Sequence, residues 1–161
     1  MKDMPSSSPA DPAVSEFTGQ LFFRLWRASH MQTAAALESI GITTALFSVL
    51  NYLMTADVAI QQEIGAAIGI DPSTMVSLID ELERAGLAKR RPHPHDRRAR
   101  EVVITPKGRR TVERGRALAR EVEDAVLQGL GSEERRQLMR LLRKALSSAP
   151  PQPLWSSEEG D

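Results

Sequence analysis

The stretch from Asp71 to Thr105 constrains the fold most, because its pattern changes from the period of a helix to that of short strands. Asp71 is a good N-cap, Pro72 suits the first helical position, and Gly86 ends the helical pattern. The apolar residues of this helix recur at steps of three and four, which predicts one buried and one free face. They are Met75, Leu78, Ile79, Leu82 and Leu87. A PHPHD turn then joins two short runs, so the sequence predicts a helix followed by a β-hairpin.

Positive charge is concentrated in and just after this hairpin. The segment from Arg84 to Arg110 holds ten Lys and Arg residues but only two acidic ones, Asp96 and Glu101, although the whole chain has 21 basic and 21 acidic residues. A segregated cationic surface suits phosphate binding, and a helix N-terminus with short hydroxylated side chains fits a DNA major groove. The coincidence of helix, hairpin and charge favours DNA binding over a solvated hairpin that is merely rich in arginine.

The residues of this stretch resemble a known family. The run TMVSLIDELERAGLAKR, from Thr74 to Arg90, and the run DRRARxxxITPKG, from Asp96 to Gly108, are similar to the recognition helix and wing of the MarR (multiple antibiotic resistance regulator) family. Its members are winged-helix transcription factors that work as dimers. The resemblance implies a mainly α fold with a small β-wing, in which a winged helix-turn-helix lobe is joined to long N- and C-terminal dimerisation helices. It also implies a repressor that binds a palindromic operator as a homodimer.

The chain divides into five expected segments. Residues 1–14, rich in Ser, Pro and Asp, should form a mobile arm, and residues 15–40 should form an amphipathic dimerisation helix. Residues 41–105 should form the DNA-binding lobe. Residues 106–147 should supply the C-terminal dimerisation helices, and residues 148–161 a Pro-rich acidic tail. At 161 residues with 41% hydrophobic content, such a chain can bury an ordinary core.

Several local features are expected inside these segments. Thr43, Thr105 and Ser132 should cap helices. Thr55–Val58 should be a linker, followed by a short helix over residues 59–68 that forms a helix-turn-helix with the next one. The residues of this short helix that should face inward are Ile60, Ile64, Ala67 and Ile68.

The DNA contacts are predicted to divide into reading and positioning. Hydroxylated and small residues at the start of the recognition helix should face base edges, whereas the cations should lie near phosphates. Replacing Arg90 by Ala should then weaken all DNA alike and flatten the salt dependence by about one charge. Arg97 and Arg98 should border an A·T-rich minor groove, with Asp96 orienting one guanidinium. The predicted DNA-binding residues are Ser73, Thr74, Val76, Ser77, Arg84, Lys89, Arg90, Asp96, Arg97, Arg98 and Arg100.

The long helices offer two further predictions. Their apolar stripes should form the dimer interface, through Phe17, Leu21, Leu25, Val126, Leu130, Leu138, Leu141, Leu142 and Leu146. In the family that this chain resembles, small aromatic or phenolic compounds commonly bind between the dimer helices and the DNA-binding lobe. The residues that could form such a site here are Phe22, Trp26, Arg27, His30 and Met31. The alternative is that these five residues are simply dimer core.

Other function classes find little support in the sequence. There is no cysteine, which excludes disulfides and thiolate chemistry, and no nucleophile pattern accompanies the histidines, so no enzyme and no cofactor are expected. His93 and His95 beside Asp96 are interpreted as a solvated wing tip rather than a metal site. No run approaches the ~18 apolar residues of a membrane span, so a cytoplasmic protein without membrane contact is expected. The competing function is a helical protein-interaction module whose basic hairpin binds an acidic partner.

Overall fold

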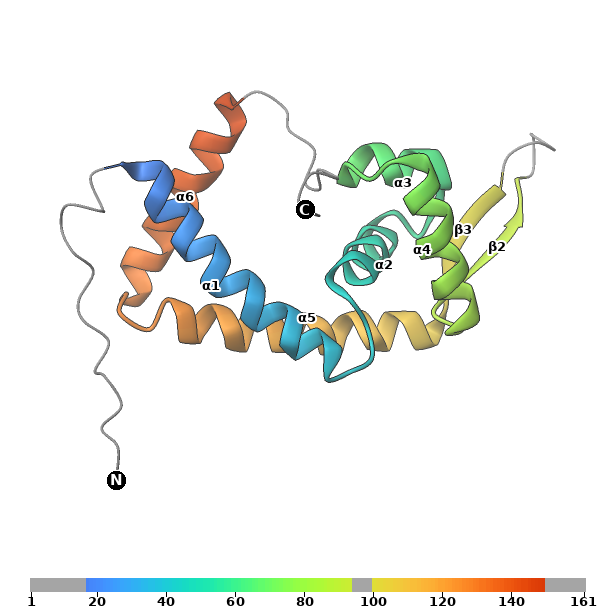
Figure 1. The fold of residues 1–161 in the computed structure, drawn as a ribbon, viewed down its shortest axis with the longest axis horizontal. Coiled ribbons are helices and arrows are strands. Elements are labelled where there is room, and N and C mark those ends of the chain that lie inside the picture. The colour runs from blue at the N-terminus through green and yellow to red at the C-terminus, as the bar shows by residue number, and fades with distance from the viewer. Residues whose placement is uncertain (1–16, 94–99, 150–161) are drawn as a thin grey trace, which may run out of the picture.

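The structure is a computed structural model that describes residues 17–93 and 100–149. Its elements are, in chain order, α1 (Thr18–Glu38), α2 (Thr44–Ala56), β1 (Val58–Ile60), α3 (Gln61–Ile68), α4 (Pro72–Arg84), β2 (Ala88–Pro92), β3 (Arg100–Ile104), α5 (Pro106–Val126) and α6 (Ser132–Ser148). Figure 1 shows a lobe of α2, α3, α4 and the sheet at one end, and α1 and α6 toward the other, with the long α5 running between them. The predicted mainly α fold with a small β-wing is confirmed.

The hydrophobic core lies almost entirely in the lobe. Every helix from α1 to α5 contributes to it, whereas α6 buries none of its residues. Large side chains with less than 2% of their surface exposed are Leu37, Val49, Leu50, Leu53, Ile64, Met75, Ile79, Leu82, Val102 and Val112. The core of the lobe thus includes Leu37 of α1 and Val112 of α5, while the far ends of the long helices have apolar faces that no other described residue covers.

The sheet contains a strand that the sequence did not predict. The strands are antiparallel in the order β1-β3-β2, with Val58 opposite Val103 and Ala88 opposite Ile104. The predicted linker Thr55–Val58 is wrong, because α2 continues to Ala56 and β1 begins at Val58. Asp57 alone joins them, in a left-handed conformation with φ at 58°. A three-residue strand carries too little alternation to be recognised, and it forms because β3 offers an unpaired edge.

Two details of α3 also differ from the prediction. The helix begins at Gln61 rather than at residue 59, since Ala59 and Ile60 belong to β1. Ala67 is exposed and Gly65 is buried in its place. A Cβ atom added to Gly65 would lie 2.9 Å from the carbonyl oxygen of Ile70, so the close turn into α4 selects glycine on the inner face.

Three of the four predicted helix caps are confirmed. The hydroxyls of Thr43 and Thr105 accept from the backbone N–H groups three residues later, and Asp71 caps α4. The prediction for Ser132 is wrong by one residue, because Ser132 is the first helical residue and Gly131 is the N-cap. The N–H of Gly131 donates to the Glu134 carboxylate at 2.7 Å, so a side chain inside the helix supplies the capping contact.

Candidate nucleic-acid interface

The N-cap Asp71 fixes the first turn of α4, and the buried residues of the helix fix which of its faces points outward. One carboxylate oxygen of Asp71 accepts from the backbone N–H groups of Ser73 and Thr74, both at 3.0 Å. With Met75, Ile79 and Leu82 buried on the inner side, the helix cannot rotate without exposing its core residues. The predicted base-reading residues are consequently all exposed, namely Ser73, Thr74, Val76 and Ser77.

Two hydroxyls on this face have their protons committed within the helix. The Ser73 hydroxyl donates to Asp71 at 2.5 Å, and the Ser77 hydroxyl donates to the Ser73 carbonyl at 3.4 Å. A hydroxyl whose proton is engaged still offers acceptor lone pairs. Toward a base edge, Ser73 and Ser77 would therefore act mainly as acceptors, which suits the amino groups of adenine and cytosine in a major groove.

The N-cap makes a prediction about pH. Hydrogen bonds from the Ser73 side chain and from Thr74 hold the pKa of the Asp71 carboxyl well below its ordinary value of 3.8. A depressed folded-state pKa means that the stabilisation is fully present above about pH 5 and is lost as the pH falls below the unfolded-state value. Asn also caps helices but does not titrate. The melting temperature of Asp71→Asn should therefore fall less between about pH 5 and pH 2 than that of the wild type, and equal falls would contradict this role.

Arg90 joins the wing to α4. Its backbone N–H donates to Glu83 at 2.6 Å, and its guanidinium binds Asp80 and Glu83, each at 2.5 Å. The same guanidinium donates to the carbonyl oxygen of Val76 at 3.4 Å and reaches Gln61 on α3 at 3.5 Å. Partial burial acts to lower the pKa of Arg90, but Asp80 and Glu83 outweigh it, and the pKa rises above its ordinary value. Arg90 was expected to lie near phosphates, yet in the structure its charge is already matched inside the lobe.

The other predicted cations differ from Arg90 in this respect. Arg84, Lys89 and Arg100 are exposed, and none of them forms an ion pair with another described residue. Arg91 binds the buried carboxylate of Glu101 on β3 at 2.5 Å, so its charge is also matched internally. The remaining predicted wing-tip residues, Asp96, Arg97 and Arg98, lie outside the described residues, as does His95.

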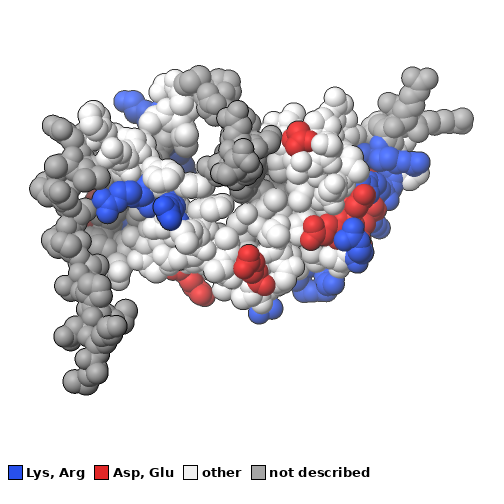
Figure 2. Space-filling view, viewed as in Figure 1, with Lys and Arg blue, Asp and Glu red and all other residues white. Residues whose placement is uncertain are grey.

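The charges of this surface lie at one edge of the molecule. Figure 2 shows Lys and Arg side chains over the β2–β3 hairpin and the adjacent end of α4, with acidic side chains among them, while the middle of the face carries few charges. The acidic residues of α4 that take part in ion pairs are Asp80 and Glu83. The cationic excess seen in the linear sequence is thus partly neutralised by the recognition helix, and exposed positive charge remains at Arg84, Lys89 and Arg100.

The predicted ligand residues all lie on α1, where His30 is half-buried and the other four are exposed. The rings of Trp26 and His30 are stacked, with centroids 4.8 Å apart and planes inclined by 16°, as their spacing of one helical turn predicted. Phe22, Arg27 and Met31 are exposed elsewhere on the same helix. Two cavities of about 420 and 470 Å³ are lined by other residues, from α3 and α4 in one case and mainly from α2 in the other. In a single chain the α1 residues therefore form an open aromatic surface rather than an enclosed pocket.

The predicted dimer residues are also only partly covered. Phe17, Leu21, Leu25, Leu141 and Leu146 are exposed, with Leu146 at 73%. Val126, Leu130, Leu138 and Leu142 are half-buried. Of the exposed large hydrophobic side chains in the described part of the chain, all but Val76 belong to α1, to the residue before it, or to α6. The exposed apolar surface of the described residues is therefore concentrated on the helices where the sequence predicted an interface.

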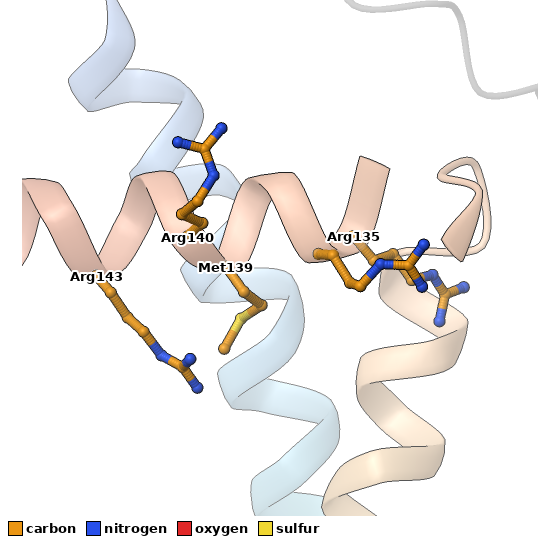
Figure 3. A pocket seen from close by; sticks show the side chains of 5 residues that line it. Arg135, Met139, Arg140 and Arg143 are labelled. Atoms are coloured by element: carbon orange, nitrogen blue, oxygen red, sulfur yellow. The ribbon is translucent and has the colours of Figure 1, made fainter. Parts of the chain in front are cut away.

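A second cationic surface was not recognised in the sequence. Four arginines of α6 and Met139 line a cavity of about 390 Å³; the arginines are Arg135, Arg136, Arg140 and Arg143. Figure 3 shows Met139 between Arg143 and Arg135 along the helix, with Arg140 pointing the other way. Arg135 donates to carbonyl oxygens near the end of α5 and binds Asp124, so it fixes the turn between the two helices. The spacing of the four residues, one to eight positions apart, could have indicated a shared helix face. This surface borders the apolar stripe of α6 and lies away from the wing.

Two negative observations apply to the described residues. No group of three or more His, Asp or Glu side chains in residues 17–93 and 100–149 is arranged to hold a metal ion. Over the same ranges, no helix combines the length and the apolar character that crossing a membrane requires.

Comparison with known proteins agrees with this geometry. The model of the MarR family matches residues 40–99, from the turn before α2 into the wing. The HTH-type transcriptional regulator BilQ of Clostridium symbiosum is 32% identical over 108 residues, which cover 67% of this chain and 75% of BilQ.

Solved structures extend the likeness to the long helices. The crystal structure of a mutant Escherichia coli MarR in complex with operator DNA has a TM-score of 0.70 at 25% identity, covering 80% of this chain and 92% of that chain. A structure of Bordetella bronchiseptica BpsR, which concerns regulation of its DNA binding by 6-hydroxynicotinic acid, has a TM-score of 0.69 at 28% identity, covering 80% of this chain and 97% of BpsR.

Proposed function

Because this chain belongs to the MarR family, and is thus a DNA-binding transcriptional regulator rather than an enzyme, we propose that it is a repressor that binds a palindromic operator as a homodimer. The outward face of α4 would enter the major groove, and Arg84, Lys89 and Arg100 would contact phosphates. The observation that carries the proposal is the exposed hydroxylated face of α4, fixed by Asp71 and bordered by the wing. Family membership favours this function over a helical module that binds an acidic protein.

The homodimer is supported by the uncovered apolar surface. In the described residues, α6 has no buried residue although it carries Leu138, Leu141, Leu142 and Leu146 on one side. Such a helix gains stability only by packing against another apolar face. Two lobes related by a two-fold axis would place their α4 helices in successive major grooves, about 10 base pairs apart, and would therefore select an inverted repeat.

We also propose that a small aromatic or phenolic compound releases the protein from DNA. The support is the Trp26–His30 stack on a helix that also exposes the side chains of Phe22, Arg27 and Met31. Stacked rings offer a flat apolar surface, and Arg27 would pair with an acidic group on the compound. The regulation of BpsR by an aromatic acid is consistent with this effector class.

The test is selection of duplexes from a random pool by the full chain, followed by footprinting and measurement of mass in solution. The expected result is an inverted repeat bound by two copies, with release by 6-hydroxynicotinic acid or a related aromatic acid.

Leu141→Glu combined with Leu146→Glu should give a monomer that binds the repeat at least about tenfold more weakly. Ser147→Glu, on the opposite side of α6, is the control and should remain dimeric. A protein that selects no sequence, or that binds only polyglutamate, would refute the proposed function.

A further inference from the structure

Val76 is an exposed apolar residue where the rest of the surface is polar. It lies on α4 with 44% of its surface exposed, whereas the other exposed large hydrophobic side chains among residues 17–93 and 100–149 belong to the long helices or the residue before α1. Its neighbours on the outward face are the hydroxyls of Ser73 and Ser77 and the carboxylate of Asp80. The apolar faces of the long helices are accounted for by the proposed dimer, but Val76 lies on α4, at the opposite end of the molecule from α6 (Figure 1).

The helix backbone that carries this side chain is tied to the wing. The carbonyl oxygen of Val76 accepts from the Arg90 guanidinium at 3.4 Å, while Asp80 and Glu83 hold the same guanidinium. A β-branched residue in a helix strongly prefers one rotamer, so the two methyl groups of Val76 present a defined apolar surface. This surface lies on the side of α4 that faces the wing, between Ser73 and Glu83 on the helix circumference.

The major groove offers such a surface one apolar counterpart. Each base pair presents donors and acceptors there, but only thymine adds a C5-methyl group. Ser73 and Ser77, whose protons are engaged inside the helix, supply acceptors for adenine or cytosine amino groups beside it. We propose that Val76 packs against the C5-methyl group of a thymine and thereby specifies a T·A pair in each half-site. This inference rests on the proposed function and adds to it the identity of one base.

The test begins once the selected site is mapped. Each thymine of a half-site is replaced in turn by deoxyuridine, which removes the methyl group and leaves pairing and the O4 acceptor unchanged. The expected result is one position at which the wild-type protein loses about threefold to fivefold in affinity, the effect of burying one methyl group. Replacing that thymine in both half-sites should cost about the square of this factor, roughly tenfold or more.

Val76→Ala identifies the residue that makes the contact. At the sensitive position this variant should bind thymine and deoxyuridine with equal affinity, because the side chain that touches the methyl group is gone. Thr111→Ser is the matched control, since it also removes one methyl group but lies on α5, outside the predicted DNA-binding residues, and serine can keep the hydroxyl bond to the Lys107 carbonyl. It should keep the full difference between thymine and deoxyuridine.

The outcomes separate this inference from the proposed function. A selected site in which no thymine is sensitive to deoxyuridine would overturn the thymine contact and leave the regulator intact. A sensitive thymine whose effect survives in Val76→Ala would assign the contact to another residue and would also overturn the inference. A protein that selects no site would overturn the proposed function itself.

Discussion

Replacing Arg90 by Ala should reduce affinity for the selected operator by about 10- to 100-fold while binding to random duplex DNA falls far less. A cation that touches only phosphates contributes to both kinds of binding. Arg90 instead holds the backbone and side chains of α4 against β2, through Asp80, Glu83 and Val76. Its loss would free the wing from the recognition helix, and only specific binding requires the two to engage DNA in one fixed arrangement.

Lys89→Ala is the matched control, because Lys89 is the adjacent residue on β2 and is exposed without an ion pair to any described residue. It should weaken specific and random binding alike, and should reduce the slope of log affinity against log salt by about 0.9. The measurement is titration of both DNAs over a range of salt concentrations. Equal losses for the two variants on both DNAs would return Arg90 to the role of a plain phosphate contact.

The carboxylates provide a second check on the same prediction. Without Arg90, Asp80 and Glu83 are unpaired anions at the DNA-facing edge, where they repel phosphates. Asp80→Asn with Glu83→Gln should therefore raise affinity more in the Arg90→Ala background than in the Lys89→Ala background, where Arg90 is still present. The same gain in both backgrounds would show that the carboxylates act on DNA independently of Arg90.

The site could be predicted from the sequence where it depends on neighbouring residues, but not where a charge such as that of Arg90 is paired with residues of another element. Caps such as Asp71 and Thr105 were predicted because a cap depends on residues only two or three positions away. The hairpin was predicted from its turn and its change of period. The role of Arg90 was not, since the sequence displays a charge but not its partners, which lie on another element seven and ten residues earlier. Positive charge in a linear run therefore overstates the charge available to DNA.

The same distinction applies to the fold. The helices were predicted because each depends on a periodic pattern within its own residues. Strand β1 was missed because its three residues are specified by pairing with Val102 and Val103, far along the chain. The arginines of α6 were missed for a different reason: the apolar stripe accounts for the helix by itself, and charged side chains that border such a stripe are usually only solvated. Local sequence patterns cannot predict a segment whose structure depends on a partner that is distant in the sequence.

Gly108→Ala should destabilise the folded state by about 3 kcal/mol, which lowers the melting temperature by roughly 6–12 °C in a chain of this size. A Cβ atom at this position would lie 2.1 Å from the carbonyl oxygen of Leu87 and 2.9 Å from Ile104. The Leu87 carbonyl cannot easily move aside, because it accepts from the backbone N–H of Thr105 at 3.0 Å. The added methyl group must therefore displace the first turn of α5 or the start of β2.

Alanine substitutions at two other helical glycines, Gly115 and Gly19, should reduce stability less than Gly108→Ala does. At Gly115 a Cβ atom would lie 2.5 Å from the ring of Phe47, and a side chain can shift where a hydrogen-bonded backbone cannot, so Gly115→Ala should cost less than Gly108→Ala. At Gly19 nothing lies within 4 Å, and alanine there should leave stability unchanged or raise it by up to about 1 kcal/mol. Thermal melts of the three variants give the order directly. If Gly108→Ala had the same melting temperature as Gly19→Ala, the base of the wing would not be packed against α5 as the structure places it. The wing would then lack the rigid support that its proposed place beside the recognition helix requires.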